Sequence, residues 1–374
     1  MLKAFKTEID PTDEQKVKIN KTIGTCRFIY NFYLAHNKEL HESGQKFMSG
    51  RAFSVWLNNE YLPAHPEKAW LKESSSKSVK KAIEDADRAF RNFFEGRAGF
   101  PRFKRKHRSD AKMYFVRNNP KDCLCERHRL KVPTLGWVRL KEKGYIPTGI
   151  PIRSGTVSMK AGRYYVSVLV DMPGACVRGH PEGQPLGIDL GLKEFAVLSN
   201  GAVYPNVNKT DRVRRLEKRL RREQRRFSRK QKGKNSRKQA LVVQRLYQRL
   251  DRIRMDYLNK AVNGIVKAKP SHVAIEDLNV SGMMRNRHLS RAIASQGFYM
   301  FREKLIRKCR EHGIEVRIAD RFFASSKTCH SCGRVKKGLK LSERTFMCPI
   351  CGLIMDRDLN AALNLRDTIK YRLA

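Results

Sequence analysis

The spacing of apolar residues divides the first 96 residues into one strand and several helices. Residues 2–9 alternate between apolar and polar positions as a strand does. Thr12 begins a capping box, S/T-x-x-E/Q, which predicts the start of a helix whose apolar stripe continues at helical spacing. Further helices are expected around Val55 and from about Ser75. The pattern therefore predicts a helical domain over residues 11–96.

Beyond residue 96 the spacing of apolar residues changes from that of helices to that of strands. Residues 97–106 are interrupted by Gly and Pro and are strongly basic, which argues against a helix. Short runs rich in β-branched and aromatic residues then follow to residue 172, about ten residues apart and with turn signals between them. This spacing is typical of a small β-barrel. Because the opening strand can join it, we expect a barrel of residues 1–10 and 97–182, with the helical domain inserted.

Residues 183–374 mix strands and helices, which indicates an α/β domain. Apolar runs that begin at Leu186, His272 and Glu315 predict strands, and the stripe from Phe298 predicts a helix. Residues 209–260 interrupt this pattern with two helical apolar stripes separated by the turn QKGKNS. We interpret this stretch as a basic helical hairpin.

The composition indicates a polyanionic partner. The formal net charge is +43 over 374 residues. So many positive side chains repel one another unless phosphates neutralise them. In the hairpin, basic residues outnumber acidic residues roughly fourfold, so few of them can pair internally. A merely solvated basic face is the alternative for each of these segments. The candidate nucleic-acid contacts are Lys77, Lys80, Arg102, Lys104, Arg105, Lys106, Arg219, Arg222, Arg226 and Arg229.

The sequence contains no run of about 18 apolar residues and no apolar signal core at its start. Its nine cysteines are an odd number without a disulfide framework. We therefore expect a protein without a membrane partner in a reducing cytoplasm, associated with the nucleoid of a prokaryotic cell.

Four of the cysteines have the spacing of a zinc site. They form two C-x2-C pairs with 15 residues between the pairs, and a glycine follows each pair. Four thiolates make a closed tetrahedral site for structural Zn²⁺, with no position left for a catalytic water. A segment this small needs the metal in order to fold. The predicted ligands are Cys329, Cys332, Cys348 and Cys351.

Three acidic residues far apart in the sequence are the candidate catalytic groups. Asp189 lies in the predicted strand GIDLG, Glu276 near the end of HVAIEDL, and Asp358 before a helical Ala/Leu pattern. If they converge, they could hold two Mg²⁺ or Mn²⁺ ions about 3.5–4 Å apart, an arrangement that cleaves phosphodiesters. Taken singly, each could instead be a strand-end or capping carboxylate. A strand followed by D-x-G also opens the phosphate loop of actin-like ATPases, but no second Gly-rich loop follows here.

With these residues in view, nearly the whole chain resembles the TnpB family, the transposon-encoded OrfB proteins related to compact type V CRISPR effectors. The resemblance rests on NFFEGRAGFPRFKRK, LGWVR, GIDLG, IEDLNVSGMMRNRHLSRAI, the paired CxxCG motifs and DRDLNAALNLR, in this order. It implies a RuvC-like RNase H fold over residues 183–374, with the zinc ribbon inserted at 325–355. It also implies that Asp189, Glu276 and Asp358 are the catalytic carboxylates, and that Asp356 is the less suitable third ligand.

The resemblance further implies a guide RNA and a target DNA as partners, with one protein chain expected for each RNA. The activity it implies is RNA-guided DNA cleavage next to a short motif. Two alternatives stay open: a non-cleaving RNA-guided DNA-binding regulator, and a transposase or resolvase that acts without RNA. The presence of all three carboxylates favours the enzyme over the regulator.

Overall fold

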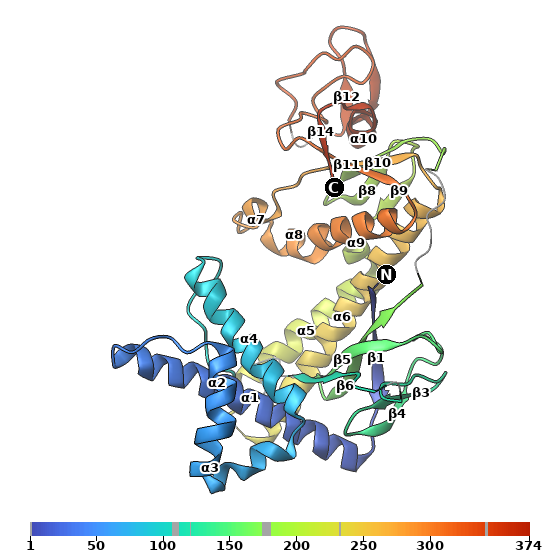
Figure 1. The fold of residues 1–374 in the computed structure, drawn as a ribbon. Helices are drawn as coiled ribbons and strands as arrows, with labels where there is room; N and C mark the ends of the chain where they lie inside the picture. Colours follow the sequence, from blue (N-terminus) through green and yellow to red (C-terminus); the bar gives the residue numbers. More distant parts are fainter. Residues whose placement is uncertain (1, 107–111, 120, 174–180, 232, 341–342) are drawn as a thin grey trace. The chain divides into compact units, whose positions relative to one another are not determined.

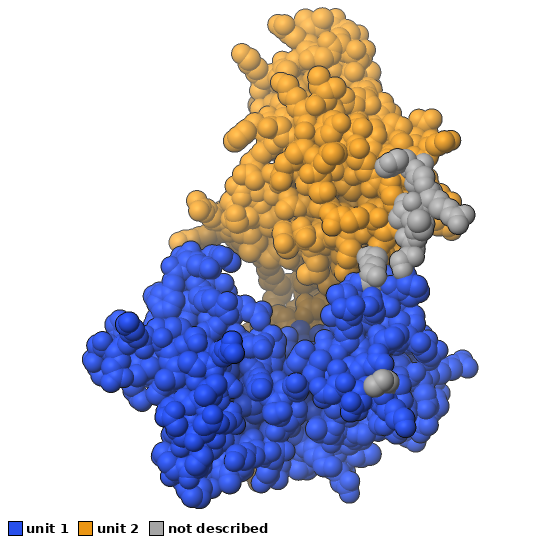
Figure 2. Space-filling model, in the orientation of Figure 1, with its two compact units in different colours: residues 1–174 blue, residues 175–374 orange. Residues whose placement is uncertain are grey.

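The computed structural model describes residues 2–106, 112–119, 121–173, 181–231, 233–340 and 343–374. The chain forms two compact units, residues 1–174 and 175–374, which Figure 2 shows in different colours. The predicted barrel range 97–182 and ribbon range 325–355 therefore include stretches that lie outside the described residues.

Six antiparallel strands form the sheet of the first unit, and the opening strand lies in its middle. Strand β1 (Leu2–Asp10) pairs with β6 from Leu2↔Asp171 to Ile9↔Tyr164, and with β4 at Ile9↔Leu140. The first strand thus joins the later strands, as its alternation indicated, and the helices lie between β1 and β2 in the chain. The strand order is β2 (Lys112–Val116), β5 (Ile152–Lys160), β6 (Arg163–Asp171), β1, β4 (Gly136–Leu140), β3 (Arg129–Val132).

One face of this sheet is buried in a single hydrophobic core. Met113 of β2 and Leu130 of β3 lie at opposite ends of the strand order, and both are fully buried in the same cluster. Val157 of β5 and Val166 of β6 are buried in that cluster too, and helix α1 (Asp13–Glu42) adds Ile19 and Ile23 to it. Among the described residues the strand pairing ends at β2 and β3.

The two helix starts that the sequence indicated are confirmed, since α1 begins after Thr12 and α4 (Ser76–Phe94) begins at Ser76. The capping box at Thr12 is complete, since the Gln15 backbone N–H donates to Thr12 Oγ1 and the Thr12 N–H donates to Gln15 Oε1. The predicted stripe of α1 is buried, with Ile19 and Tyr33 completely inaccessible. The elements that follow are α1 (Asp13–Glu42), α2 (Gly50–Trp56), the π-helix η1 (Leu57–Tyr61), α3 (Leu62–Ala64), the 3₁₀-helix η2 (Pro66–Glu73) and α4 (Ser76–Phe94). Of these, η1, α3 and η2 were not predicted.

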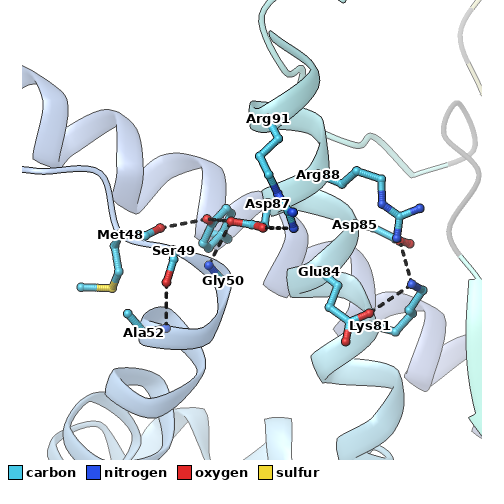
Figure 3. A network of polar contacts seen from close by, with 11 residues as sticks. Met48, Ser49, Gly50, Ala52, Lys81, Glu84, Asp85, Asp87, Arg88 and Arg91 are labelled. Atoms are coloured by element: carbon cyan, nitrogen blue, oxygen red, sulfur yellow. Dashed lines mark hydrogen bonds and ion pairs between the residues drawn. The ribbon is translucent and has the colours of Figure 1, made fainter. Parts of the chain in front are cut away.

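A buried carboxylate joins three of these helices (Figure 3). Asp87 of α4 accepts hydrogen bonds from the Gly50 N–H at 3.0 Å and from Arg91 Nη2 at 2.6 Å. The Tyr33 hydroxyl of α1 lies 2.9 Å from the same carboxylate, and burial raises the pKa of this hydroxyl. A Cβ at position 50 would lie 3.1 Å from Asp87 Cβ, so glycine lets α2 approach α4 closely.

The second unit contains a mixed six-stranded sheet (Figure 1). Strands β7, β10 and β11 are parallel to one another, while β8, β9 and β14 pair antiparallel to their neighbours. The short strands β9 and β14 were not predicted, because three residues are too few to show a period. The strand order is β14 (Tyr371–Leu373), β11 (Glu315–Ala319), β10 (His272–Glu276), β7 (Leu186–Leu190), β8 (Glu194–Leu198), β9 (Val203–Pro205).

The basic hairpin consists of α5 (Asp211–Ser228) and α6 (Lys234–Lys267), and its second helix extends beyond the predicted end at residue 260. The first half of α6 packs against α5 through Val243, Leu246 and Leu250. Its second half, including Leu258 and Ile265, is buried in the core of the sheet together with α9 (Phe298–Glu311). The prediction ended the helix at residue 260, where the basic stretch ends. The helix continues to Lys267 because the apolar residues of its last turns are buried in the core of the sheet.

Two short strands, β12 (Thr345–Met347) and β13 (Ile354–Asp356), lead into helix α10 (Arg357–Asp367). The short helices α7 (Val280–Met283) and α8 (Ser290–Gln296) follow β10, and η3 (Val207–Lys209) precedes α5. None of the helices in the described ranges combines the length and the apolar character that a membrane crossing requires.

Candidate nuclease site and zinc ribbon

A glycine allows α10 to lie directly on β7. A Cβ at Gly187 would come 1.9 Å from the carbonyl oxygen of Ala362 and 2.6 Å from the backbone nitrogen of Arg366. No side chain could be accommodated without moving the helix. The matching positions are small as well, since Ala274 pairs with Gly187 across the sheet and Ala362 is fully buried. This contact sets the position of α10 over the sheet.

The same contact brings Asp358 towards Asp189. Side chains two residues apart in a strand lie on the same face, so Asp189 points to the face where Gly187 meets α10. Asp358 is one helical turn before Ala362, about 6 Å along the helix axis. Asp189 is two residues after Gly187, about 6.6 Å along the strand. The two carboxylates are therefore displaced by similar distances from one contact point.

Glu276 joins them through the strand register. Strand β10 runs parallel to β7 with Ile275 opposite Ile188, so one further step places Glu276 opposite Asp189. Neighbouring strands lie about 4.8 Å apart, and side chains in register share a face. The three predicted carboxylates thus come from the carboxyl ends of two adjacent strands and from the first turn of the helix that covers them.

The electrostatics of the site reflect this crowding. Burial, followed by the negative charges of Glu276 and Asp358, raises the pKa of the Asp189 carboxyl to about 8. Burial also raises the pKa of Glu276. Ionised carboxylates in such a place need a cation, and hard oxygen ligands suit Mg²⁺ or Mn²⁺. The three do not form a tight cluster, however: within the described ranges, the cysteines alone bring their ligand atoms within 4.8 Å of one another.

Asp356 has a structural partner of its own. It is the N-cap of α10, and its Oδ1 accepts hydrogen bonds from the backbone N–H groups of Asp358 at 2.9 Å and Leu359 at 3.0 Å. Asp358 lies one residue inside the helix, with Oδ2 at 3.8 Å from Nη1 of Arg344. The two acids of the DRD motif therefore have different surroundings, which sequence spacing alone did not separate.

The four predicted zinc ligands come together. Sγ of Cys329 lies 3.5 Å from that of Cys351, and Sγ of Cys332 lies 3.6 Å from that of Cys348. Zn–S bonds of about 2.3 Å in a tetrahedron separate the sulfurs by about 3.8 Å. The backbone N–H groups of Cys351 and Ile350 hold the pKa of Cys348 below its usual range. The four sulfurs thus fit structural Zn²⁺ in geometry.

Each cysteine pair is folded as the glycines indicated. Gly333 and Gly352 have φ of 70° and 71°, a left-handed conformation that favours glycine. Gly333 N–H donates to the Cys329 carbonyl at 2.9 Å, and Gly352 N–H donates to the Cys348 carbonyl at 3.2 Å. Phe346 is fully buried against Cys329 and Cys348 and belongs to the small core of this segment.

Two asparagines that the sequence did not single out fasten the ribbon to α10. Asn360 donates to the Thr328 carbonyl at 2.7 Å and accepts from the His330 N–H at 3.1 Å. Asn364, one turn later, donates to the carbonyls of Ser325 and Thr328 at 2.8 and 2.7 Å. Their i, i+4 spacing is the signal that could have indicated a shared helix face. The first zinc knuckle and Asp358 are thus held by the same helix.

Asp277, the neighbour of Glu276, binds three arginines. Its carboxylate lies 2.8 Å from Nη1 of Arg302, 3.0 Å from Nη2 of Arg321 and 3.4 Å from Nη2 of Arg372. These arginines come from α9, from the segment after β11 and from β14. Asp277 therefore joins three neighbouring elements at the sheet end that carries Glu276.

The four arginines predicted for the hairpin surface are all exposed on α5 or just after it. Arg222 and Arg226 lie 3.7 and 3.2 Å from Glu223, a buried acid that also accepts a hydrogen bond from Gln239 at 2.8 Å. The apolar seam therefore contains one carboxylate that the periodicity did not indicate. The exposed face remains strongly basic and includes Arg219 and Arg229.

In the first unit, the predicted contacts lie on α4 and on the segment that follows it. Lys77 and Lys80 are exposed, and Lys80 lines an open pocket of about 530 Å³ among the helices. Arg102, Arg105 and Lys106 are exposed as well. Lys104 is half-buried, with Nζ 3.7 Å from the centre of the Tyr30 ring. Asn31 of α1 holds the Lys104 backbone by two hydrogen bonds, of 2.7 and 2.9 Å.

Three sequence families match successive parts of the chain. Residues 165–287 match a family described as a probable transposase, OrfB_IS605. Residues 298–365, which include the ribbon and α10, match the family "Cas12f1-like, TNB domain". Residues 1–46 match a family described as a helix-turn-helix domain, although residues 13–42 form one continuous helix in this structure.

Relatives with assigned names match over almost the full length. "Putative RNA-guided DNA endonuclease InsQ" of Escherichia coli (strain K12) is 33% identical over 97% of this chain and 91% of its own. A protein of Streptomyces pristinaespiralis with the description "Putative RNA-guided DNA endonuclease" is 32% identical over 97% of this chain and 88% of its own. Two solved CRISPR complexes, titled as Cas12f1–sgRNA–target DNA and as a Cas12f ternary complex, align over 98% and 96% of this chain, with TM-scores of 0.38 and 0.42.

These matches place the chain among transposon-encoded proteins. It belongs to the TnpB family, the OrfB proteins of IS605-type elements, as its motifs indicated.

Proposed function

We propose that this protein is an RNA-guided DNA endonuclease that binds a guide RNA and cleaves target DNA beside a short motif. The observation that carries this proposal is the placement of Asp189, Glu276 and Asp358 at one end of a mixed sheet. Membership of a family whose relatives are named RNA-guided DNA endonucleases supports it, as does the net charge of +43. Such a protein would act on nucleoid DNA in the cytoplasm, with one chain for each RNA.

We propose a RuvC-like RNase H fold for residues 183–374, with the basic hairpin of α5 and α6 and with the ribbon at 325–355. The antiparallel strand β8 followed by the parallel strands β10 and β11 supports this assignment. The antiparallel sheet of the first unit, whose later strands pair with β1 and share one core, supports a barrel of residues 1–10 and 97–182, with residues 11–96 as a helical recognition domain.

In this proposal, Asp189, Glu276 and Asp358 hold Mg²⁺ or Mn²⁺. The bound ions would supply an activated water and would stabilise the leaving oxygen in phosphodiester hydrolysis. The chain itself positions the ligands: Gly187 admits α10, and Asp356 caps the helix that presents Asp358. Arg344, beside Asp358, is placed to contact the substrate phosphate.

Zn²⁺ in the four-cysteine site would have a structural role, since four thiolates complete its coordination. Bound to the ribbon, it would keep the Thr328–His330 segment in place for the hydrogen bonds with Asn360 and Asn364. The exposed arginines of α5, together with Lys77, Lys80 and the segment 102–106, would contact phosphates of the guide RNA and of the guide–target duplex.

The test is cleavage by the full-length protein purified with the RNA it binds in the cell. Asp189→Asn and Glu276→Gln should each abolish Mg²⁺-dependent cleavage of a matched target while RNA binding persists. Asp211→Asn, an exposed acid in the first turn of α5, is the matched control and should cut normally. Cleavage that survives either active-site change would exclude this catalytic assignment. A preparation that cuts without RNA would instead identify a transposase- or resolvase-type nuclease.

A further inference from the structure

The side chain of one phenylalanine is almost completely exposed to solvent at the sheet end that carries the candidate carboxylates. Phe322 exposes 90% of its surface, while the adjacent Phe323 is half-buried. Single exposed apolar residues are common and need no explanation by themselves. Phe322 is different because of how its backbone is held and because of what lies beside it.

Hydrogen bonds fix the turn that carries the ring. Asp320 Oδ1 accepts from the Phe322 N–H at 2.8 Å, and the Asp320 carbonyl accepts from the Phe323 N–H at 3.0 Å. The Asp320 N–H itself donates to the Lys370 carbonyl at 3.1 Å. A side chain on a turn held at these points projects in a defined direction.

The turn lies at the sheet end that carries Glu276. Strands β10 and β11 are parallel, with Glu276 opposite Ala319. Phe322 comes three residues after Ala319. Arg321, its neighbour, is tied to Asp277 by the 3.0 Å ion pair, and Asp277 directly follows Glu276. The exposed ring and the candidate catalytic carboxylate are therefore carried by two adjacent segments with a direct link.

The surroundings of the ring are positively charged. Three guanidinium groups meet the carboxylate of Asp277, and the Asp320 carboxylate accepts from the Phe322 N–H, so three positive charges face two negative ones. Two of the guanidinium groups are largely open to solvent, since 50% of the Arg321 side chain and 66% of the Arg372 side chain are exposed. An aromatic ring flanked by cations that can bind phosphates is the combination that holds single-stranded nucleic acid.

We propose that Phe322 stacks on an unpaired base of the strand that enters the carboxylate site, while Arg321 and Arg372 contact the adjoining phosphates. The inference rests on the proposed nuclease function and adds a substrate requirement to it. A paired base in a duplex keeps both faces stacked on its neighbours, so only an unpaired or extruded base can offer a face to this ring. Phe322 thereby selects for locally unwound substrate and positions it; it takes no part in the chemistry.

The experiment compares Phe322→Leu, which keeps an apolar side chain, with Phe322→Trp, which keeps an aromatic face. Both are measured in the full-length protein with its RNA. Stacking is worth about 1–3 kcal/mol per base, which corresponds to a roughly 5- to 150-fold loss in kcat/KM for the Leu variant. Phe322→Trp should cut like the wild type. Ile369→Ala, which removes another apolar side chain that is 88% exposed, is the control and should change nothing.

Abasic nucleotides placed one at a time along the substrate strand identify the stacked base. At one position, the abasic nucleotide should lower the cleavage rate of the wild-type protein to that of Phe322→Leu. The same abasic nucleotide should not lower the cleavage rate of Phe322→Leu any further. Equal rates for wild type and Phe322→Leu, or additive losses at every position, would overturn the proposal.

A binding measurement separates this outcome from failure of the nuclease assignment. The fluorescence of single-stranded DNA that contains 2-aminopurine should be quenched by the Asp189→Asn protein, and the quenching should disappear when Phe322→Leu is added. Quenching that does not depend on Phe322 would overturn the proposal even if the protein cuts DNA. The same follows if Phe322→Leu alters only the oligomeric state, measured by sedimentation, because the ring would then contact a second copy.

Discussion

The Oδ1 atom of Asp356 accepts a hydrogen bond from the backbone nitrogen of Asp358 at 2.9 Å. One acid of the DRD motif therefore caps the helix whose first turn presents the other. Capping gives Asp356 a structural role, whereas the carboxylate of Asp358 lies 3.8 Å from Arg344 and its negative charge helps to raise the pKa of Asp189.

This relationship predicts that Asp→Asn substitutions at positions 356 and 358 have opposite effects on cleavage. Asp356→Asn should retain most of the cleavage activity because asparagine also caps helices, whereas Asp356→Ala should cost about 1 kcal/mol of stability. Asp358→Asn should abolish cleavage and leave stability nearly unchanged. Cleavage rates and urea unfolding of the three variants check this. Loss of cleavage in Asp356→Asn with full activity in Asp358→Asn would reverse the assignment of the two acids.

The contact between β7 and α10 predicts that position 187 accepts no side chain. In Gly187→Ala, the new Cβ would overlap the Ala362 carbonyl, so α10 must move and Asp358 moves with it. We expect a loss of about 1–3 kcal/mol or more in stability, together with a large loss of cleavage. Gly338→Ala is the matched control, because a Cβ at that position has open space around it. Equal stability of the two variants would show that α10 does not lie on β7 in this way.

The cysteine geometry predicts about one zinc per chain after gel filtration. Cys348→Ser should lower the zinc content and make the ribbon sensitive to protease, because the metal stabilises a segment with a very small core. Cys125→Ser, a half-buried thiol of the first unit, is the control and should keep its zinc. Zinc content is measured by elemental analysis. A ribbon that stays protease-resistant in metal-free wild-type protein would contradict a structural role for the metal.

The basic face of α5 predicts a change in salt dependence. Replacing Arg219, Arg222, Arg226 and Arg229 with Gln should weaken RNA binding. It should also make the log–log salt slope shallower by roughly 0.7–0.9 for each phosphate that the variant no longer neutralises. Lys260→Gln, an exposed residue on α6 that pairs with Asp256, serves as the control. Binding is measured at several salt concentrations. An unchanged slope in the quadruple variant would remove this face from the binding surface.

Glu223 makes the stability of the hairpin depend on pH. The hydrogen bond from Gln239, opposed by burial and aided by Arg226 and Arg222, holds the pKa of Glu223 below its usual 4.5. A lowered folded-state pKa stabilises the hairpin above pH 4.5, and this stabilisation is lost as the pH falls through the folded value. Glu223→Gln should therefore destabilise the hairpin at neutral pH, and its difference from wild type should vanish once Glu223 is protonated in the folded protein.

Hydrogen exchange of α5 and α6 amides at several pH values measures this effect. Asp256→Asn, which removes a largely exposed acid from α6, is the matched control and should behave like wild type throughout. A difference between Glu223→Gln and wild type that stays constant at every acidic pH where the hairpin is folded would show that ionised Glu223 does not stabilise it.

Periodicity and spacing predicted most of the longer elements and the candidate carboxylates and thiols, but not Arg344. The capping box placed the start of α1, and short apolar runs separated by turn signals indicated the five strands between Lys112 and Asp171. The C-x2-C spacing defined the thiol cluster. Such features are local, so neighbouring residues contain the information. The same reasoning missed the end of α6, which is buried in the core of the sheet, and the three-residue strands β9 and β14, of which β14 pairs with the distant β11.

The sequence by itself determined which residues could do chemistry: three carboxylates, four thiols and a large excess of cations, in the order of a known family. The resemblance favoured Asp358 over Asp356 as the third ligand, and only the tertiary structure showed that Asp356 caps the helix that carries Asp358. It also showed that Gly187 admits α10, that Asn360 and Asn364 hold the ribbon, and that Asp277 joins three arginines at the site. The physical reason is that these roles depend on close contacts between segments far apart in the chain. Residue type and spacing specify what a side chain can bind, whereas packing specifies what it meets.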